Sequence, residues 1–249
     1  MDVLNFREPV SAWTHFSWLV LSVPATVLLC LRCRGQLVKQ ACFVIYGLSL
    51  AAGYGGSVFY HAVRLPHNVV EGACQNVDFI GIYLMIAGNV TPLAVAALSG
   101  TWRRSILGLT WGLAAIGIVV RACDLYVPRD LSTCVYLGMG WGVVLCYFEL
   151  GRKLTHRKLL LLPLGGLTYT VGAVMNLKHW PHMWPGVFSH HDLYHLLVMT
   201  GTALHFVFMW RTLAPYRATA LRRETQAVTT TSVSPATPAA ASAMALLKT

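Results

Sequence analysis

Several polar side chains in this sequence lie inside or at the edge of apolar stretches, at spacings that suit a metal ion. His191 and His195 are four residues apart, so on a helix they share one face and can bind the same ion. With His61 from another apolar stretch they supply three neutral nitrogen ligands and leave one position open, which is the form of a catalytic zinc site. Imidazole also suits copper, iron and nickel, so zinc is the preferred metal and not the only one that fits.

Asp78 and Ser57 are the candidates for catalytic roles beside such an ion. A metal lowers the pKa of its bound water from 15.7 to about 7, and a nearby carboxylate can orient that water and take its proton. Asp78 either does this or ligates the ion directly. Ser57 stands one turn before His61 and can hydrogen-bond the water, a substrate carbonyl or the second nitrogen of a ligand.

Each of these residues alone has a plainer interpretation. A single histidine near the end of a span is typical of the membrane interface, Asp78 alone suits the N-terminal cap of a helix, and Ser57 alone suits close helix packing. A metal site is favoured only if the fold brings these residues to one place, so the elements that carry them decide the matter.

The composition predicts an all-α, integral membrane fold. Of the 249 residues 56% are hydrophobic and only 11% are charged, and the mean hydropathy is +0.58, whereas soluble domains average about 25% charged residues. Apolar runs long enough to cross about 30 Å of hydrocarbon follow one another along the chain. Seven are predicted: Val10–Leu31, Ala41–Val63, Gln75–Leu98, Ser105–Val120, Leu131–Glu149, Leu159–Leu177 and Ser189–Trp210.

Short connectors make consecutive spans antiparallel, so the end of the second span and the starts of the third and seventh share one side of the membrane. His61, Asp78 and His191 therefore lie at a similar depth, and they meet if these helices are neighbours. A polar group inside a span is costly and is a functional hypothesis by default. The topology thus favours one site on the amino-terminal side of a seven-helix bundle.

The net charge of +10 is interpreted as a membrane signature, and no nucleic-acid partner is expected. Basic residues cluster in the connectors, 14 of them on one side with the tail and 5 on the side of the amino terminus. The positive-inside rule then puts the amino terminus outside and the tail in the cytoplasm. Residues 1–212 are predicted to form the membrane domain, and residues 213–249, rich in Thr, Ser, Ala and Pro, a disordered tail.

The sequence resembles the hemolysin III branch of the progestin and adipoQ receptor family. The motifs that carry this resemblance are Arg7-Glu-Pro-Val-Ser-Ala-Trp-Thr-His15, Ser57-x-x-x-His61, Asp78-x-x-Gly81-Ile-Tyr, Ile86-Ala-Gly-Asn-Val-Thr-Pro92, Gly165-Gly166-Leu-Thr-Tyr169-Thr-Val-Gly172, and His191-Asp-Leu-Tyr-His195 continuing to His205-Phe. Asn89 departs from the small or hydroxylated residue expected there, and His190 offers a second ligand register, although only His191 is four residues from His195.

The resemblance implies a seven-helix fold with one zinc on His61, His191 and His195, and with Asp78 bonded to the zinc water. Receptor members of the family are associated with the hydrolysis of ceramide-like amides, and they keep the amino terminus and the metal in the cytoplasm. The charge count predicts the opposite orientation. The hemolysin III branch itself is named for cell lysis, and the short chain without a soluble domain suggests a bacterial inner membrane.

Two functions from different classes are compatible with these features. The first is a zinc-dependent hydrolase of lipid amides or esters, with lipid entering sideways between helices and Asp78 as the base. The second is a non-catalytic lytic, channel-forming or sensor protein with a structural metal. Retention of a water in the fourth position favours the hydrolase, and direct ligation by Asp78 favours the structural metal. A bundle without any metal is the third and plainest outcome.

Overall fold

The protein is described by a computed structural model that covers residues 6–184 and 187–216. The all-α prediction is confirmed: among the described residues seven helical segments are long and apolar enough to cross a membrane, and their order and number agree with the prediction. Within the described ranges the one extended pairing is an isolated bridge between Trp184 and Phe188. The predicted tail falls largely on residues 217–249, which lie outside the described residues.

Several spans are built from more than one element, because short π or 3-10 turns interrupt the α-helices. The elements are α1 (Pro9–Arg32), α2 (Leu37–Ala62), α3 (His67–Val69), a π turn (Val70–Cys74), α4 (Gln75–Ala97), α5 (Gly100–Ala122), α6 (Arg129–Trp141), a 3-10 turn (Gly142–Cys146), α7 (Tyr147–Gly151), α8 (His156–Leu159), α9 (Leu161–Leu177), α10 (His190–Phe208) and a final π turn (Met209–Leu213).

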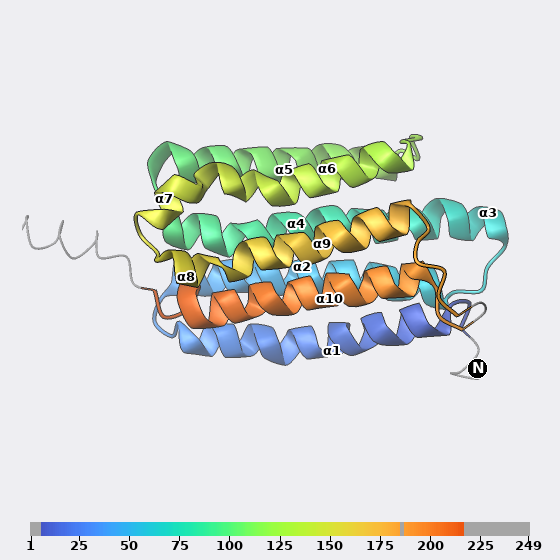
Figure 1. The fold of residues 1–249 in the computed structure, drawn as a ribbon, viewed down its shortest axis with the longest axis horizontal. Helices are drawn as coiled ribbons and strands as arrows, with labels where there is room; N and C mark the ends of the chain where they lie inside the picture. The colour runs from blue at the N-terminus through green and yellow to red at the C-terminus, as the bar shows by residue number, and fades with distance from the viewer. Residues whose placement is uncertain (1–5, 185–186, 217–249) are drawn as a thin grey trace, which may run out of the picture. The chain divides into compact units, whose positions relative to one another are not determined.

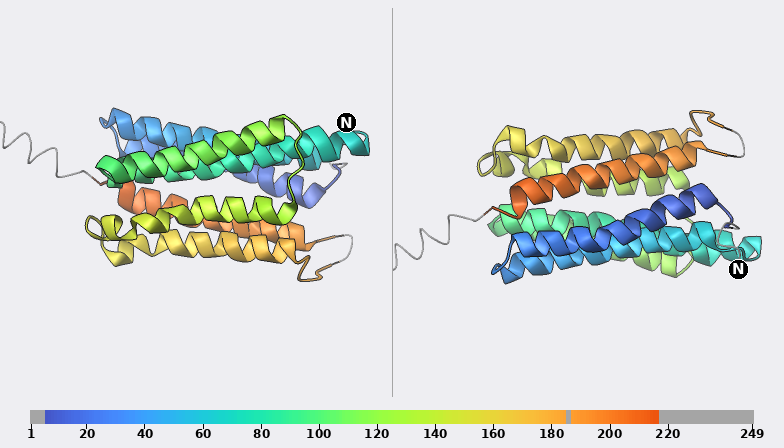
Figure 2. Two further views of the ribbon diagram at one scale, coloured as in Figure 1. Left: turned by 90° about the horizontal axis from the view of Figure 1, so that it is seen from above. Right: turned by 90° about the horizontal axis from the view of Figure 1, so that it is seen from below.

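The long helices lie side by side in a bundle (Figure 1). Helix α1 packs on α2 and α10, α2 packs on α4, α4 on α5, and α9 on both α6 and α10. The views from above and below show α10 between α1 and α9 (Figure 2). The end of α2 and the starts of α1 and α10 therefore lie at the same end of the bundle, as the antiparallel topology predicts.

Glycines allow α2 and α4 to approach closely where they carry site residues. A Cβ added at Gly56 would lie 2.9 Å from the carbonyl oxygen of Val77, and one added at Gly81 would lie 2.8 Å from the Cα of Gly53. Small residues at such crossings let helix backbones touch in a membrane. Gly56 and Val77 immediately precede Ser57 and Asp78, so this contact sets the serine beside the aspartate.

Local sequence signals fix the two helix starts nearest the site. Pro9 stands in the first turn of α1, where its missing N–H has no helical partner to lose. Helix α10 begins with a capping box, in which the Ser189 side chain accepts from the Asp192 backbone N–H and the Asp192 side chain accepts from the Ser189 backbone N–H. This reciprocal cap defines where the His191 and His195 turn of α10 begins.

The third span begins earlier than predicted. Its helical path starts at His67 and passes through the π turn Val70–Cys74 before α4, whereas the apolar run begins only at Gln75.

The far end of the bundle is closed by an apolar cluster that includes Phe43, Phe208 and Leu213.

Candidate metal centre

Three imidazoles, two of them buried and one partly buried, meet at the amino-terminal end of the bundle. His61 lies in the last turn of α2, and His191 and His195 lie in the first two turns of α10. One nitrogen from each ring lies within 4.8 Å of the others, and His61 and His195 are 0% and 3% exposed. A tetrahedral zinc holds its nitrogens about 3.4 Å apart, so small ring movements would close this group on one ion.

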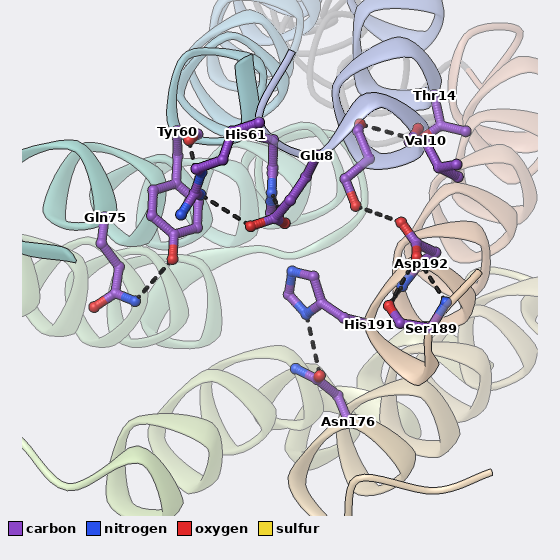
Figure 3. A network of polar contacts seen from close by, with 12 residues as sticks. Glu8, Val10, Thr14, Tyr60, His61, Gln75, Asn176, Ser189, His191 and Asp192 are labelled. Carbon is purple, nitrogen blue, oxygen red and sulfur yellow. Dashed lines mark hydrogen bonds and ion pairs between the residues drawn. The ribbon is translucent and has the colours of Figure 1, made fainter. Parts of the chain in front are cut away.

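His61 is held from behind by Glu8, which directly precedes α1. The Glu8 backbone N–H donates to the His61 carbonyl at 3.0 Å, and the His61 Nδ1–H donates to Glu8 Oε2 at 2.6 Å (Figure 3). Burial raises the pKa of the Glu8 carboxyl, but the hydrogen bond and charge of His61 and the charge of Arg7 outweigh burial and lower it below its ordinary value. Glu8 is therefore ionised at neutral pH.

The carboxylate of Glu8 determines which nitrogen of His61 is free for a metal. With the proton on Nδ1, the lone pair is on Nε2, and this atom is buried with no hydrogen-bond partner among the described residues. A carboxylate behind a ligating histidine fixes its tautomer and raises its basicity. A buried nitrogen lone pair without a partner is the feature that a bound cation would satisfy.

His191 is held in the same way by an amide from a different helix. Its Nδ1 lies 3.1 Å from Oδ1 of Asn176, near the end of α9. Figure 3 shows the His191 ring between the Glu8–His61 pair and this asparagine. His195 carries a second orphaned nitrogen, since its Nδ1 is buried without a partner in the part of the chain that the structure describes. The donor set is thus three neutral imidazoles, which fits zinc.

A clamp joins α1 to the first turn of α10. Ser11 Oγ donates to Asp192 Oδ1 at 2.6 Å, while the other carboxylate oxygen accepts from the Ser189 backbone N–H at 2.8 Å (Figure 3). Asp192 follows His191 directly. The clamp therefore fixes the position of His191 relative to α1 through the backbone of α10.

Asp78 and Ser57 lie on the wall of the same site. Asp78 acts electrostatically on His61 and lies beside Ser57. Ser57 is 3% exposed, and its hydroxyl lies within hydrogen-bonding reach of the Asp78 carboxylate. The structure thus brings all five predicted site residues together.

A cavity of about 1200 Å³ opens from this group into the bundle, somewhat above the 300–1,000 Å³ typical of small-molecule sites. Its wall includes Ser57, Asp78, His191 and His195 at one end and apolar side chains such as Leu159 toward the other. Such a polar end joined to a long apolar body suits a lipid whose reactive group lies at the histidines.

Sequence reasoning missed three residues of this site. Glu8 and His15 were noticed only as parts of a motif, and Asn176 gave no signal at all. His15 on α1 is 6% exposed, its ring centroid lies 4.1 Å from that of His195, and neither of its nitrogens has a partner among the described side chains. An acidic residue directly before the first span was the available clue to Glu8.

The second ligand register is excluded by the geometry. His190 Nε2 lies 3.1 Å from His179 Nδ1, so this ring points to a neighbouring histidine, and His191 is the member of the three-histidine group.

Comparisons with known proteins identify relatives over most of the chain. Residues 4–206 match the family described as haemolysin-III related. The chain is 32% identical over 204 residues to the Hemolysin-3 homolog of Bacillus subtilis, covering 80% of this chain and 91% of that protein, and 32% identical to Hemolysin-3 of Bacillus cereus, covering 80% and 89%. It is 23% identical over 210 residues to the human Monocyte to macrophage differentiation factor, covering 83% and 84%.

Proposed function

Because the chain belongs to the haemolysin-III related family and gathers three imidazoles at one end of a large cavity, we propose that it is a zinc-dependent membrane hydrolase of lipid amides or esters. The observation that carries the proposal is the different use of the two nitrogens in each ring. Glu8 and Asn176 hold the outer nitrogens of two histidines, and the inner nitrogens remain free. Structural zinc sites are closed by four protein ligands, whereas this group offers three.

Each residue then has a specific task. His61, His191 and His195 hold the ion, which when bound supplies a Lewis acid and lowers the pKa of water. Asp78 orients the attacking water and accepts its proton. Ser57 Oγ, which is buried beside Asp78, hydrogen-bonds the substrate carbonyl. The apolar body of the cavity holds the acyl chain, which arrives sideways from the bilayer.

Two measurements test this function. Metal content is determined for detergent-purified protein without a histidine tag, and about one zinc per chain is expected in the wild type and none in a folded His191→Ala/His195→Ala variant. Release of fatty acid from a panel of lipid amides and esters is then compared for the wild type, Asp78→Ala and a control, Asp130→Ala, an exposed position in the first turn of α6.

Asp78→Ala is expected to lower turnover by at least about 100-fold, in the range of a lost general base, while zinc content and helicity persist. Turnover near the wild-type rate would show that the role of Asp78 is wrong. Absence of zinc from the wild type would remove the hydrolase. If liposome leakage occurs and tolerates Asp78→Ala, the alternative of a lytic, channel-forming or sensor protein with a structural metal would replace it.

We also propose the orientation given by the charges, with the amino terminus and the metal centre outside and the tail in the cytoplasm of a bacterial inner membrane. The support is the asymmetry of basic residues, 14 against 5, between the two sides. A topology reporter fused after Thr249 tests it, and activity of the reporter on the outer side would overturn the orientation.

A further inference from the structure

Arg121 is a buried arginine in the last turn of α5. It is 8% exposed, and it lies on the wall of the cavity that also contains Asp78 and the histidines. Its guanidinium carbon lies 4.2 Å from the centre of the Phe79 ring, and its Nη2 donates to Ser132 Oγ at 2.7 Å. The side chain is therefore held in place inside the bundle and does not extend toward water.

No carboxylate balances this charge among the side chains that the structure describes. The ion pairs among the described residues join Arg7 and His61 to Glu8, and Lys153 to Glu149. Of the five N–H donors of Arg121, one is used by Ser132, and Nε is buried with no partner in the described part of the chain. A buried charge without a partner is strongly unfavourable, and the partial negative charge at the end of α5 offsets only part of that.

A second hydroxyl lies beside it. Tyr136 follows Ser132 by one helical turn on α6, so both face the same way, and both line the cavity with Arg121. The Tyr136 hydroxyl is buried, and its neighbour is Tyr83, with which it shares a ring contact and a hydrogen bond. A guanidinium and two hydroxyls, with no acid among them, form a set of hydrogen-bond donors that suits an anion and not a cation.

The position of this set relative to the metal centre indicates what the anion belongs to. Phe79, whose ring lies against the Arg121 guanidinium, directly follows Asp78 in α4, and Arg121 and Asp78 line the same cavity. In a glycerophospholipid a short glycerol unit separates the phosphate from the first acyl carbonyl. An anionic head group at Arg121 would therefore leave its acyl carbonyl near the histidines.

We propose that Arg121, Ser132 and Tyr136 bind the phosphate group of a lipid, so that the protein selects anionic phospholipids over neutral lipids such as ceramide or diacylglycerol. Three converging donors match the non-bridging oxygens of a phosphate better than the two oxygens of a carboxylate, and arginine binds phosphate through two parallel hydrogen bonds. The inference rests on the proposed function for calling that lipid a substrate. The binding itself requires no turnover.

The test measures binding of lipids that cannot be hydrolysed, so it is independent of the hydrolase proposal. Ether-linked dialkyl phosphatidic acid and the matched dialkylglycerol are titrated against the full-length, metal-containing protein in detergent by native mass spectrometry. The wild type is expected to bind the phosphate lipid at least about tenfold more tightly, as one charge-assisted contact predicts. Arg121→Gln is expected to abolish that preference and leave dialkylglycerol binding unchanged.

Matched variants separate recognition from folding. Arg103→Gln removes an arginine that is not on the cavity wall and donates to the carbonyl of Leu98, and it is expected to retain the full preference. Ser132→Ala and Tyr136→Phe each remove one hydroxyl, and each is expected to weaken phosphate-lipid binding several-fold even if Arg121→Gln does not fold.

Three results would overturn the inference. Equal binding of the two lipids by the wild type would remove the anion site, and a preference that persists in Arg121→Gln would remove the arginine from it. Oleate bound as tightly as the phosphate lipid, and lost with Arg121→Gln, would replace phosphate by a carboxylate. Inorganic phosphate that competes at the same concentration as the phosphate lipid would assign the site to free phosphate and not to a head group.

Discussion

Helix α10 carries two buried histidine sites that differ in one respect. His195 belongs to the three-histidine group, and His205 lies ten residues further on, about 15 Å along the helix axis. His205 uses both ring nitrogens: Nε2 donates to the Leu162 carbonyl at 3.1 Å, and Nδ1 accepts from the Asn89 amide at 2.6 Å. In the three-histidine group each ring of His61 and His191 is held through one nitrogen only.

The neighbours of His205 are equally well paired. Thr202 accepts from the Tyr54 hydroxyl at 2.8 Å, lies 3.0 Å from the Tyr169 hydroxyl and donates to the Val198 carbonyl at 3.1 Å. Buried polar side chains therefore occur in both regions, and the difference lies in the unused nitrogen atoms. A histidine with two partners serves the fold, whereas a histidine with one fixed partner and one free lone pair is prepared for a ligand.

The largest expected effect on metal content comes from removing one imidazole of the three-histidine group. His61→Ala takes away the ligand that joins α2 to α10, and three ligands become two. Zinc content measured by plasma mass spectrometry is expected to fall from about one per chain to near zero. His205→Gln serves as the control and should retain the metal. Equal loss of zinc from both variants would mean that the two histidine sites are not distinct.

A smaller effect on metal affinity is expected from changing Glu8, which supports His61 in the three-histidine group. Glu8→Gln keeps an acceptor near His61 but removes the negative charge that makes the ring a better ligand. Loss of such a supporting group costs about 10–100-fold in metal affinity, which competition with a zinc chelator measures. Glu149→Gln is the matched control, because Glu149 pairs with Lys153. Unchanged zinc affinity in Glu8→Gln would assign Glu8 to docking of the amino-terminal segment alone.

These two tests also separate what the sequence could predict from what it could not. The spans follow from the length and hydropathy of the apolar runs, and the His191–His195 pair follows from helical periodicity alone. Joining them to His61 required only the antiparallel order of short connectors. All three steps depend on residues that are close in the chain or on a simple topology, so sequence reasoning reached them.

The supporting contacts depend on tertiary packing, which the sequence does not encode locally. Glu8 reaches His61 across 53 positions, and Asn176 reaches His191 from another helix. That no carboxylate pairs with Arg121 among the described side chains depends on the packing around it, and no spacing rule in the sequence predicts it. His15 is a similar case, since nothing in an apolar first span predicts that its ring will lie against His195.

A variant beside His205 is expected to have the smallest effect on metal binding. It should lower the stability of the protein instead. Asn89→Leu keeps the number and branching of the side-chain heavy atoms but removes the donor to His205 Nδ1, so a buried acceptor is left unpaired. Hydrogen bonds between membrane helices contribute about 0.6–2 kcal/mol, and the free energy of unfolding in detergent titrations is expected to fall by about that amount. Zinc content and chelator competition should remain at wild-type values.

A double-mutant cycle decides whether this loss belongs to the pair. His205→Ala is expected to destabilise the protein more than Asn89→Leu. It also removes the donor to the Leu162 carbonyl and leaves a cavity beside Gly165. Once the His205 ring is absent, Asn89→Leu should lower the free energy of unfolding little further. The double variant should therefore lose less stability than the sum of the two single losses. Full additivity would contradict the hydrogen bond, and zinc loss in Asn89→Leu would show that the paired histidine also supports the metal centre.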